Sequence, residues 1–230
     1  MAATDSILPA PPLPGVVPAR ARTVFVVTHP EATHHVDGLV GGQFDSELTA
    51  KGLDDAGRIA AALAGRISEE RSRSVVSSDL RRTAQTATAI GDDLGVEPRL
   101  DRRLREKSYG VAGGREQSWL DERFVAPPAV GDRLRHHEGV EGAESRLEVA
   151  CRVYEAMSEA LARDVDDLVV VTHGFAATFV VAAWIGMPIE ATGHVAFHVR
   201  SGSITTLRED GFFHNRAVVA VGETSHLVAD

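Results

Sequence analysis

Two histidines, nearly the whole chain apart, follow valine-rich runs that end on the same letters, VVT. They are His29 and His173. A third apolar run ends at Ser77 and Ser78, and Arg82 follows it at the start of a helical pattern. A neutral imidazole can attack phosphorus, and an arginine can donate two hydrogen bonds at once to phosphate oxygens. If folding brings these side chains together, they predict phosphoryl-transfer chemistry.

The apolar runs that end on these residues do not alternate with polar positions, which is typical of strands buried on both faces. They are Thr23–Thr28, Arg73–Ser78 and Asp167–Thr172. Helical patterns lie between them, at Thr49–Ile67, Asp79–Leu94 and Ser145–Leu161. This alternation predicts an α/β fold, a three-layer α/β/α sandwich with a mainly parallel sheet. Ligands collect at the carboxyl ends of such strands, so we expect the histidines and the arginine at one rim.

Segments outside this alternation predict how the domain is bounded. Residues 1–22 are rich in proline, which predicts a flexible arm before a domain spanning residues 23–230. Residues 108–142 are rich in glycine, proline and charge, which predicts a small cap inserted over the site. The runs at 203–209 and 216–222 predict a closing hairpin. The first helical pattern is expected to bury Leu53, Ala56, Ile59, Ala60 and Leu63.

Composition is that of a soluble globular protein and argues against several partners. With 230 residues, of which 43% are hydrophobic, one domain can bury its own core. The net charge of -9 argues against nucleic-acid binding, which needs a basic surface. No apolar stretch approaches the ~20 residues of a membrane span, and the N-terminus is a poor signal peptide.

The single cysteine, Cys151, cannot form an internal disulfide. We therefore expect a reducing, cytoplasmic setting, with this thiol acting as a small core side chain. The sequence leaves open whether the chain is a monomer or a homodimer.

Two histidine pairs, His34-His35 and His136-His137, raise the question of a metal site. Adjacent residues on an extended segment point to opposite sides, so each pair is expected to supply one ligand at most. No cysteine and histidine spacing of the zinc type is present. We therefore predict neither a metal nor another cofactor.

Several motifs, taken in order, resemble those of one family. SSDLRRTAQTA (77–87) resembles the Ser-Ser-x-Leu-x-Arg-Ala-x-Gln-Thr-Ala segment of the histidine phosphatase superfamily, also called phosphoglycerate mutase-like. GGQFDSELTAKG (41–52) is similar to that family's Gly-x-x-Asp-x-x-Leu-Thr-x-x-Gly. RLREKSYG, GAESRLEVACRV, VVVTHG and GETSHL also fit. The resemblance covers residues 23–227 and implies a phosphatase that hydrolyses a small phosphate monoester through a phosphohistidine.

The resemblance also implies a role for individual residues. His29 falls at the nucleophile that forms the phosphohistidine, and Arg82 falls at the phosphate-binding arginine. His173 falls at the second histidine that contacts the phosphate, and Glu106 at the proton donor. His35 occupies the place where many members carry a phosphate-contacting asparagine.

One departure from the family is chemically important. Where the family carries Arg-His-Gly, this chain has Thr28, His29 and Pro30. Loss of one preorganised donor typically costs ~10²–10³ in rate. Thr28 can offer the substrate a hydroxyl but no charge, and Pro30 removes a backbone N–H that could have faced the anion.

Three consequences of this departure stay open at the level of sequence. Another cation, such as His35, Arg102 or Arg115, could replace the lost charge. The substrate could instead be placed differently, or the protein could bind a phosphorylated ligand with little catalysis. Glu106 could pair with Arg102 or Arg103 rather than donate a proton. A phosphoglycerate-type mutase is the alternative among related enzymes, although such mutases generally carry a larger cap.

Overall fold

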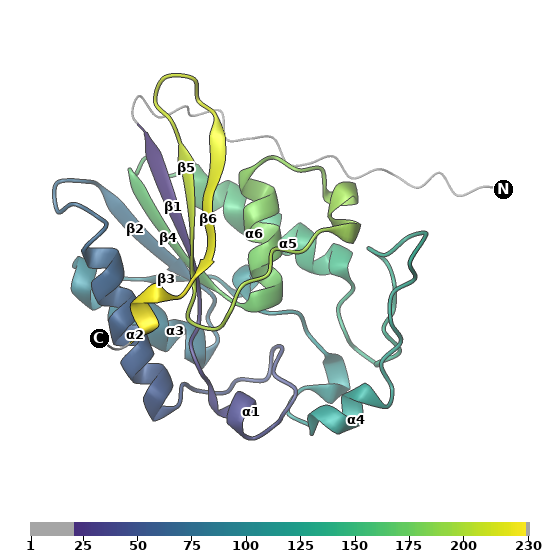
Figure 1. The fold of residues 1–230 in the computed structure, drawn as a ribbon. Helices are drawn as coiled ribbons and strands as arrows, with labels where there is room; N and C mark the ends of the chain where they lie inside the picture. The colour runs from purple at the N-terminus through teal and green to yellow at the C-terminus, as the bar shows by residue number, and fades with distance from the viewer. Residues whose placement is uncertain (1–20, 229–230) are drawn as a thin grey trace.

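A six-stranded sheet forms the centre of the protein in the computed structural model, which describes residues 21–228 (Figure 1). The strands are β1 (Arg22–Thr28), β2 (Arg73–Ser77), β3 (Arg99–Leu100), β4 (Asp167–Thr172), β5 (Ile204–Glu209) and β6 (Arg216–Glu223). Their order across the sheet is β3-β2-β4-β1-β5-β6. The first four strands in this order are parallel, whereas β5 and β6 are antiparallel to their neighbours. The predicted parallel sheet and closing hairpin are confirmed.

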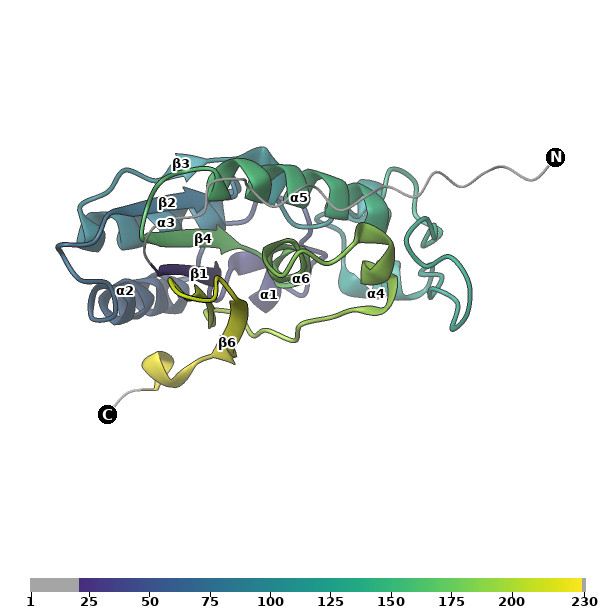
Figure 2. The same ribbon diagram turned by 90° about the horizontal axis from the view of Figure 1, so that it is seen from above.

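Helices cover both faces of the sheet, as Figures 1 and 2 show. The helices are α1 (Thr33–Val36), α2 (Ala50–Ala64), α3 (Arg81–Leu94), α4 (Gln117–Asp121), α5 (Arg146–Leu161) and α6 (Gly174–Trp184). α5 and α6 pack on one face, and α2 and α3 pack on the other. The predicted three-layer sandwich is therefore confirmed.

Strand β1 shows why the strand sequences lack alternation. Val24 and Val26 point into the core under α5 and α6, whereas Phe25 and Val27 point into the core under α2 and α3. All four side chains are at most 4% exposed. Because each such side chain stabilises the fold by about 1.5–3 kcal/mol when buried, a polar residue on either face would lower the free energy of unfolding.

Helix α2 is shorter than predicted, and one of its expected core residues is wrong. The Thr49 side chain accepts a hydrogen bond from the Gly52 N–H and so caps the helix, which ends at Ala64. Leu53 is 50% exposed. Its neighbour Gly52 makes the close contact instead, because a Cβ there would lie 2.0 Å from the Glu31 carbonyl oxygen.

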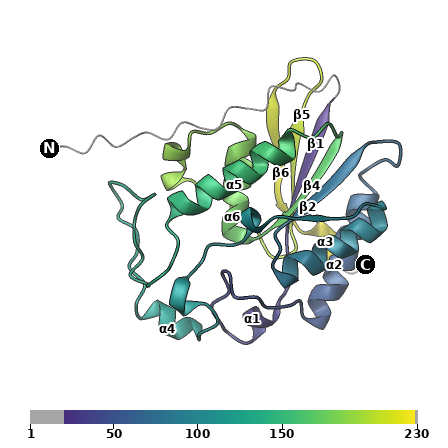
Figure 3. The same cartoon turned by 180° about the vertical axis from the view of Figure 1, so that it is seen from behind.

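Four elements have no counterpart in the sequence prediction: β3, α1, α4 and α6. Helix α6 is buried over residues 176–184, so it lacks the polar face on which amphipathic patterns depend. The segment predicted as a cap contains α4 and long irregular stretches, and it lies beside α1 (Figures 1 and 3). A small apolar cluster joins this segment to the loop after α1 and contains Val40, Ala112, Leu120, Val140 and Ala143.

Other sequence predictions have mixed outcomes. Cys151 is partly buried and packs against the core beneath α5 and α6, as expected. The predicted N-terminal arm lies outside the described residues. Over residues 21–228 no helix has the length and apolar character needed to cross a membrane.

Candidate active site

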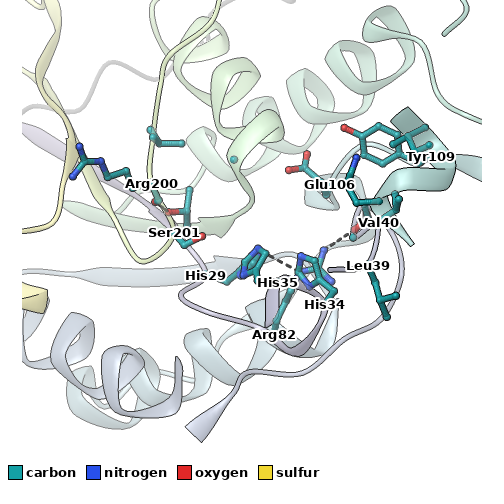
Figure 4. Close-up of a pocket in the computed structure, with 17 residues that line it drawn as sticks. His29, His34, His35, Leu39, Val40, Arg82, Glu106, Tyr109, Arg200 and Ser201 are labelled. Carbon is teal, nitrogen blue, oxygen red and sulfur yellow. Dashed lines mark hydrogen bonds between the residues drawn. The ribbon is translucent and has the colours of Figure 1, made fainter. Parts of the chain in front are cut away.

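A cavity of about 330 Å³ opens at the carboxyl ends of the parallel strands (Figure 4). Its walls contain Thr28, His29, His35, Arg82 and Glu106, all of which the sequence singled out. These residues come from the end of β1, from α1, from the start of α3 and from the segment before α4. The parallel topology thus gathers distant segments at one rim, as predicted.

The two strand-end histidines meet because β1 and β4 are neighbours in register. Thr28 pairs with Thr172 across the two strands, so His29 and His173 follow side by side. Their ring centroids lie 5.1 Å apart. The expectation that the two Thr-His sequences converge is confirmed.

The hydrogen bonds of His29 define its tautomer. Its Nδ1 lies 2.8 Å from the Pro30 carbonyl oxygen, and the Arg82 Nε–H donates to its Nε2 over 3.1 Å. Since arginine can only donate, Nε2 must be an acceptor, and the proton is assigned to Nδ1. Burial, and then the Arg82 guanidinium, lower the pKa of His29 well below the ordinary histidine range. His29 is thus neutral, with a lone pair on Nε2, as a nucleophile requires.

Arg82 is held by the loop before α2 and is buried, and no carboxylate within residues 21–228 forms an ion pair with it. Its guanidinium donates to the carbonyl oxygens of Gly42, over 2.6 Å, and Phe44, over 2.8 Å. Burial lowers the pKa of Arg82 to about 10, so the group stays positively charged at neutral pH. Asp45, in the same loop, accepts a hydrogen bond from the Arg81 N–H at the start of α3. The loop and α3 together therefore fix a cation beside His29.

His173 lies behind the His29 ring and is not part of the cavity wall. It is fully buried, and its Nε2 lies 2.9 Å from the Ser78 hydroxyl oxygen. Burial, and then the Arg82 guanidinium, lower its pKa well below the ordinary range. The His173 ring contacts the His29 ring edge-on. Direct contact with phosphate stays a prediction.

Glu106 points into the cavity from the side opposite His29 and Arg82 (Figure 4). Its carboxylate accepts backbone N–H bonds from Lys107 and, at the start of α6, from Phe175 and Ala176, over 2.9–3.1 Å. Burial raises the pKa of Glu106, although these three bonds act in the opposite direction. A raised pKa favours the protonated form that a proton donor needs.

The alternative in which Glu106 pairs with Arg103 is wrong. The Arg103 guanidinium binds the carboxylates of Asp101 and Glu159 instead. Arg102 lines a separate cavity together with Arg105 and other polar side chains. The Glu106 carboxylate is therefore held by backbone groups.

His34 and His35 lie on the helical turn α1, so the expectation that they point to opposite sides is wrong. Their ring centroids are 4.0 Å apart, and both rings line the cavity. The His35 ring stacks on His29 at 5.6 Å, and its Nδ1 accepts the Ala32 N–H. Burial is the main cause that lowers the pKa of both residues, that of His34 to about 3. A lowered pKa favours the neutral form of His35, whose side chain is exposed at the cavity, so it is not a fixed positive charge like that of an arginine.

Thr28 is engaged with a loop that the sequence did not connect to the site. Its hydroxyl donates to the Arg200 carbonyl oxygen over 2.5 Å and accepts the Ser203 N–H over 3.1 Å. The side chain is 3% exposed. The Thr28 hydroxyl thus holds the loop in place, and this arrangement uses the proton that it would donate to a substrate.

Arg115, the other proposed replacement for the charge, does not line the cavity either. Its Nε–H donates to the Val111 carbonyl oxygen, and its guanidinium stacks on Trp119 at 4.6 Å. In the part of the chain that the structure describes, only Arg82 and Arg200 bring a guanidinium-bearing residue to the cavity wall.

Arg200 and Ser201 are lining residues that the sequence prediction missed. The available signal was indirect. β5 runs antiparallel to β1, with Ile204 opposite Val27, so the segment before β5 must lie near the carboxyl end of β1. Recognising this required knowing which strand the hairpin joins. Across residues 21–228, no group of three or more histidine, cysteine or acidic residues is arranged to hold a metal ion.

Comparisons with known proteins identify the family of this chain. The family model of the histidine phosphatase superfamily (branch 1) matches residues 24–219. A probable phosphoglycerate mutase GpmB from Enterobacter sp. is 32% identical over 213 residues, covering 90% of this chain and 95% of that protein. A glucosyl-3-phosphoglycerate phosphatase from Mycobacterium tuberculosis is 30% identical over 183 residues, covering 74% of this chain and 78% of that protein.

Solved structures show the same fold over nearly the full length. A structure described as mycobacterial hydrolase 1 superposes with a TM-score of 0.72 at 26% identity, covering 90% of this chain and 100% of that chain. The native structure of a mycobacterial glucosyl-3-phosphoglycerate phosphatase gives a TM-score of 0.70 at 26% identity, covering 89% and 100%.

Proposed function

The chain belongs to the histidine phosphatase superfamily, branch 1, and we propose that it hydrolyses a small phosphate monoester through a phosphohistidine on His29. The observation that supports this most strongly is the geometry of the His29 ring. Its Nε2 carries a lone pair and lies 3.1 Å from the Nε of a buried, charged Arg82. A nucleophile and an anion-binding cation are thus adjacent, and phosphoryl transfer depends chiefly on such positioning.

In the first step, His29 Nε2 attacks the phosphorus atom. The bond between phosphorus and the leaving oxygen breaks, and Glu106 gives its proton to that oxygen. The Arg82 Nε–H that faces Nε2 turns to an oxygen of the incoming phosphoryl group, and the guanidinium stabilises the negative charge of that group. The Pro30 carbonyl, which binds Nδ1, stabilises the positive charge that develops on the ring.

In the second step, water hydrolyses the phosphohistidine. Glu106, now a carboxylate, takes a proton from the water as its oxygen attacks phosphorus. The bond between phosphorus and nitrogen breaks, and inorganic phosphate leaves with the His29 ring again neutral. The cycle needs no metal or organic cofactor. A cytoplasmic setting, which the single cysteine favours, is part of the proposal.

The test is turnover together with covalent labelling. The purified protein is incubated with p-nitrophenyl phosphate and with a panel of phosphorylated metabolites that includes glucosyl-3-phosphoglycerate and phosphoglycerates. We expect release of inorganic phosphate and an acid-labile phosphoryl label on the wild type. His29→Ala should abolish both, whereas the control His194→Ala, at an exposed histidine outside the cavity, should keep both.

Two other functions would give different results in the same experiment. A mutase, as the similarity to the probable phosphoglycerate mutase GpmB suggests, would return the label to a second phosphoglycerate and release little phosphate. A binding protein, which Thr28 and Pro30 favour, would bind a phosphorylated ligand with neither label nor turnover. Steady release of phosphate from a labelled intermediate would exclude both.

A further inference from the structure

We propose that Arg200 supplies a second positive charge to the transferring phosphoryl group, in place of the motif arginine that this chain lacks at Thr28. This inference rests on the proposed function. It assigns Arg200 a catalytic role for the same reaction, because its guanidinium would touch the phosphoryl oxygens.

The site has a charge deficit that one more guanidinium would correct. Arg82 is the cation fixed beside His29, and the three histidine rings on the cavity wall have lowered pKa values, which favour their neutral forms. A phosphate monoester is a dianion near neutral pH, and its transition state needs stabilisation at three oxygens. Arg200 is the other guanidinium-bearing residue among the described residues that line the cavity.

The loop that carries Arg200 is bonded directly to the catalytic end of β1. The Arg200 carbonyl accepts the Thr28 hydroxyl, and the Gly202 N–H donates to the His29 carbonyl over 3.0 Å. Gly202 has a φ of +74°, and a Cβ there would lie 2.9 Å from a Leu227 side-chain carbon. A non-glycine residue would therefore be strained at this position. The loop backbone itself is fixed to the end of β1 by its hydrogen bonds to Thr28 and His29.

The residue at the position of the lost arginine thus anchors the backbone of another arginine. Thr28 supplies no charge itself, but its hydroxyl fixes the peptide of Arg200 at the cavity rim. In this proposal, the guanidinium that the family carries at the end of β1 is replaced by the Arg200 guanidinium on the neighbouring loop.

The Arg200 side chain is free to reach the phosphoryl group. It is exposed, and no described residue forms a hydrogen bond or ion pair with its guanidinium. Figure 4 shows it turned away from His29, with its backbone next to Ser201 at the cavity. The proposal requires a rotation between staggered side-chain conformations that turns the guanidinium toward His29, and such rotations take picoseconds to nanoseconds at exposed positions.

The test compares Arg200→Ala and Arg200→Lys with Arg208→Ala. Arg208 is an exposed arginine on β5 that does not line the cavity, so it controls for the change in net charge. We expect Arg200→Ala to lower kcat/KM about 10²-fold, the lower end for loss of one oxyanion donor. The loss should be similar for p-nitrophenyl phosphate and for alkyl phosphates, Arg200→Lys should be intermediate, and Arg208→Ala should match the wild type.

Two results would overturn the assignment while leaving the phosphatase intact. One is wild-type activity in Arg200→Ala. The other is a loss confined to substrates that carry a carboxylate, which would mean that Arg200 binds the leaving group. If the wild type itself neither turns over nor becomes labelled, the proposed function fails, and binding of orthovanadate by calorimetry then tests Arg200. Weaker binding by Arg200→Ala supports the anion contact, and equal binding by the two proteins excludes it.

Discussion

Replacing Glu106 by glutamine separates its role as a proton donor from its role in the fold. The carboxylate accepts three backbone N–H bonds, two on Oε1 and one on Oε2. A glutamine that keeps its oxygen at the Oε1 position turns its NH2 group toward the Phe175 N–H, so two donors face each other. One unsatisfied buried donor costs about 1–3 kcal/mol in the free energy of unfolding. The variant should therefore be folded but less stable, as urea denaturation would measure.

The effect on rate depends on the leaving group. An alkyl oxygen must be protonated as it leaves, so Glu106→Gln should lower kcat for an alkyl phosphate by ~10²–10⁴. The anion of p-nitrophenol leaves without a proton, so the same variant should lose far less in the rate at which p-nitrophenyl phosphate phosphorylates His29, measured as the burst of p-nitrophenol. Equal losses in this first step for both substrates would refute the assignment of Glu106 as the acid and would point to a positional defect. Glu141→Gln, at an exposed glutamate of the cap, is the matched control.

The pH profile gives a second measurement of the same group. Burial raises the pKa of Glu106, so the protonated form persists to a higher pH than for an ordinary glutamate. As the pH rises through this pKa the acid is lost, and hydrolysis of an alkyl phosphate by the wild type should fall. Glu106→Gln should lack this limb of the profile. A profile unchanged by the substitution would assign the limb to another group.

The remaining predictions concern stability. The folded-state pKa of His34 is about 3 and its ordinary value is 6.5, so below pH 6.5 the unfolded chain takes up a proton that the folded chain does not. Stability should then fall with decreasing pH by up to about 1.4 kcal/mol per unit from this residue, and urea denaturation of His34→Asn should show a shallower slope. Thr28→Val leaves its hydrogen-bond partners on the 200–203 loop unpaired, so it should lower the free energy of unfolding by about 1–3 kcal/mol. The variant should also lose phosphatase activity. Full activity would mean that catalysis does not depend on the hydrogen bonds that hold this loop. Gly110→Ala should destabilise the cap by about 1–3 kcal/mol, because φ is +53° and a Cβ would lie 1.9 Å from a carbonyl oxygen. Gly57→Ala, in open space on α2, should instead stabilise by about 0.5–1 kcal/mol, and thermal unfolding compares the two.

The local sequence was sufficient to predict the elements whose environment is simple. The runs that form β1, β2 and β4 are apolar on both faces because helices cover both sides of the sheet. This pattern can be recognised in the amino-acid sequence alone. Parallel strands end at one edge, so the meeting of His29 with His173 followed from topology. The motifs around Arg82 and Glu106 carried the family resemblance, since each motif is a short contiguous stretch of sequence.

Burial and long-range hydrogen bonds were decided only by the tertiary structure. His34 and His35 were expected to diverge, but four residues of helix place both rings at the cavity, where His34 is buried and His35 stays exposed. α6 has no polar face, so the sequence shows no hydrophobic periodicity from which the helix could be predicted. The contact between Thr28 and Arg200 joins residues 172 positions apart. No local pattern encodes that contact, because it exists only once β5 has paired antiparallel with β1.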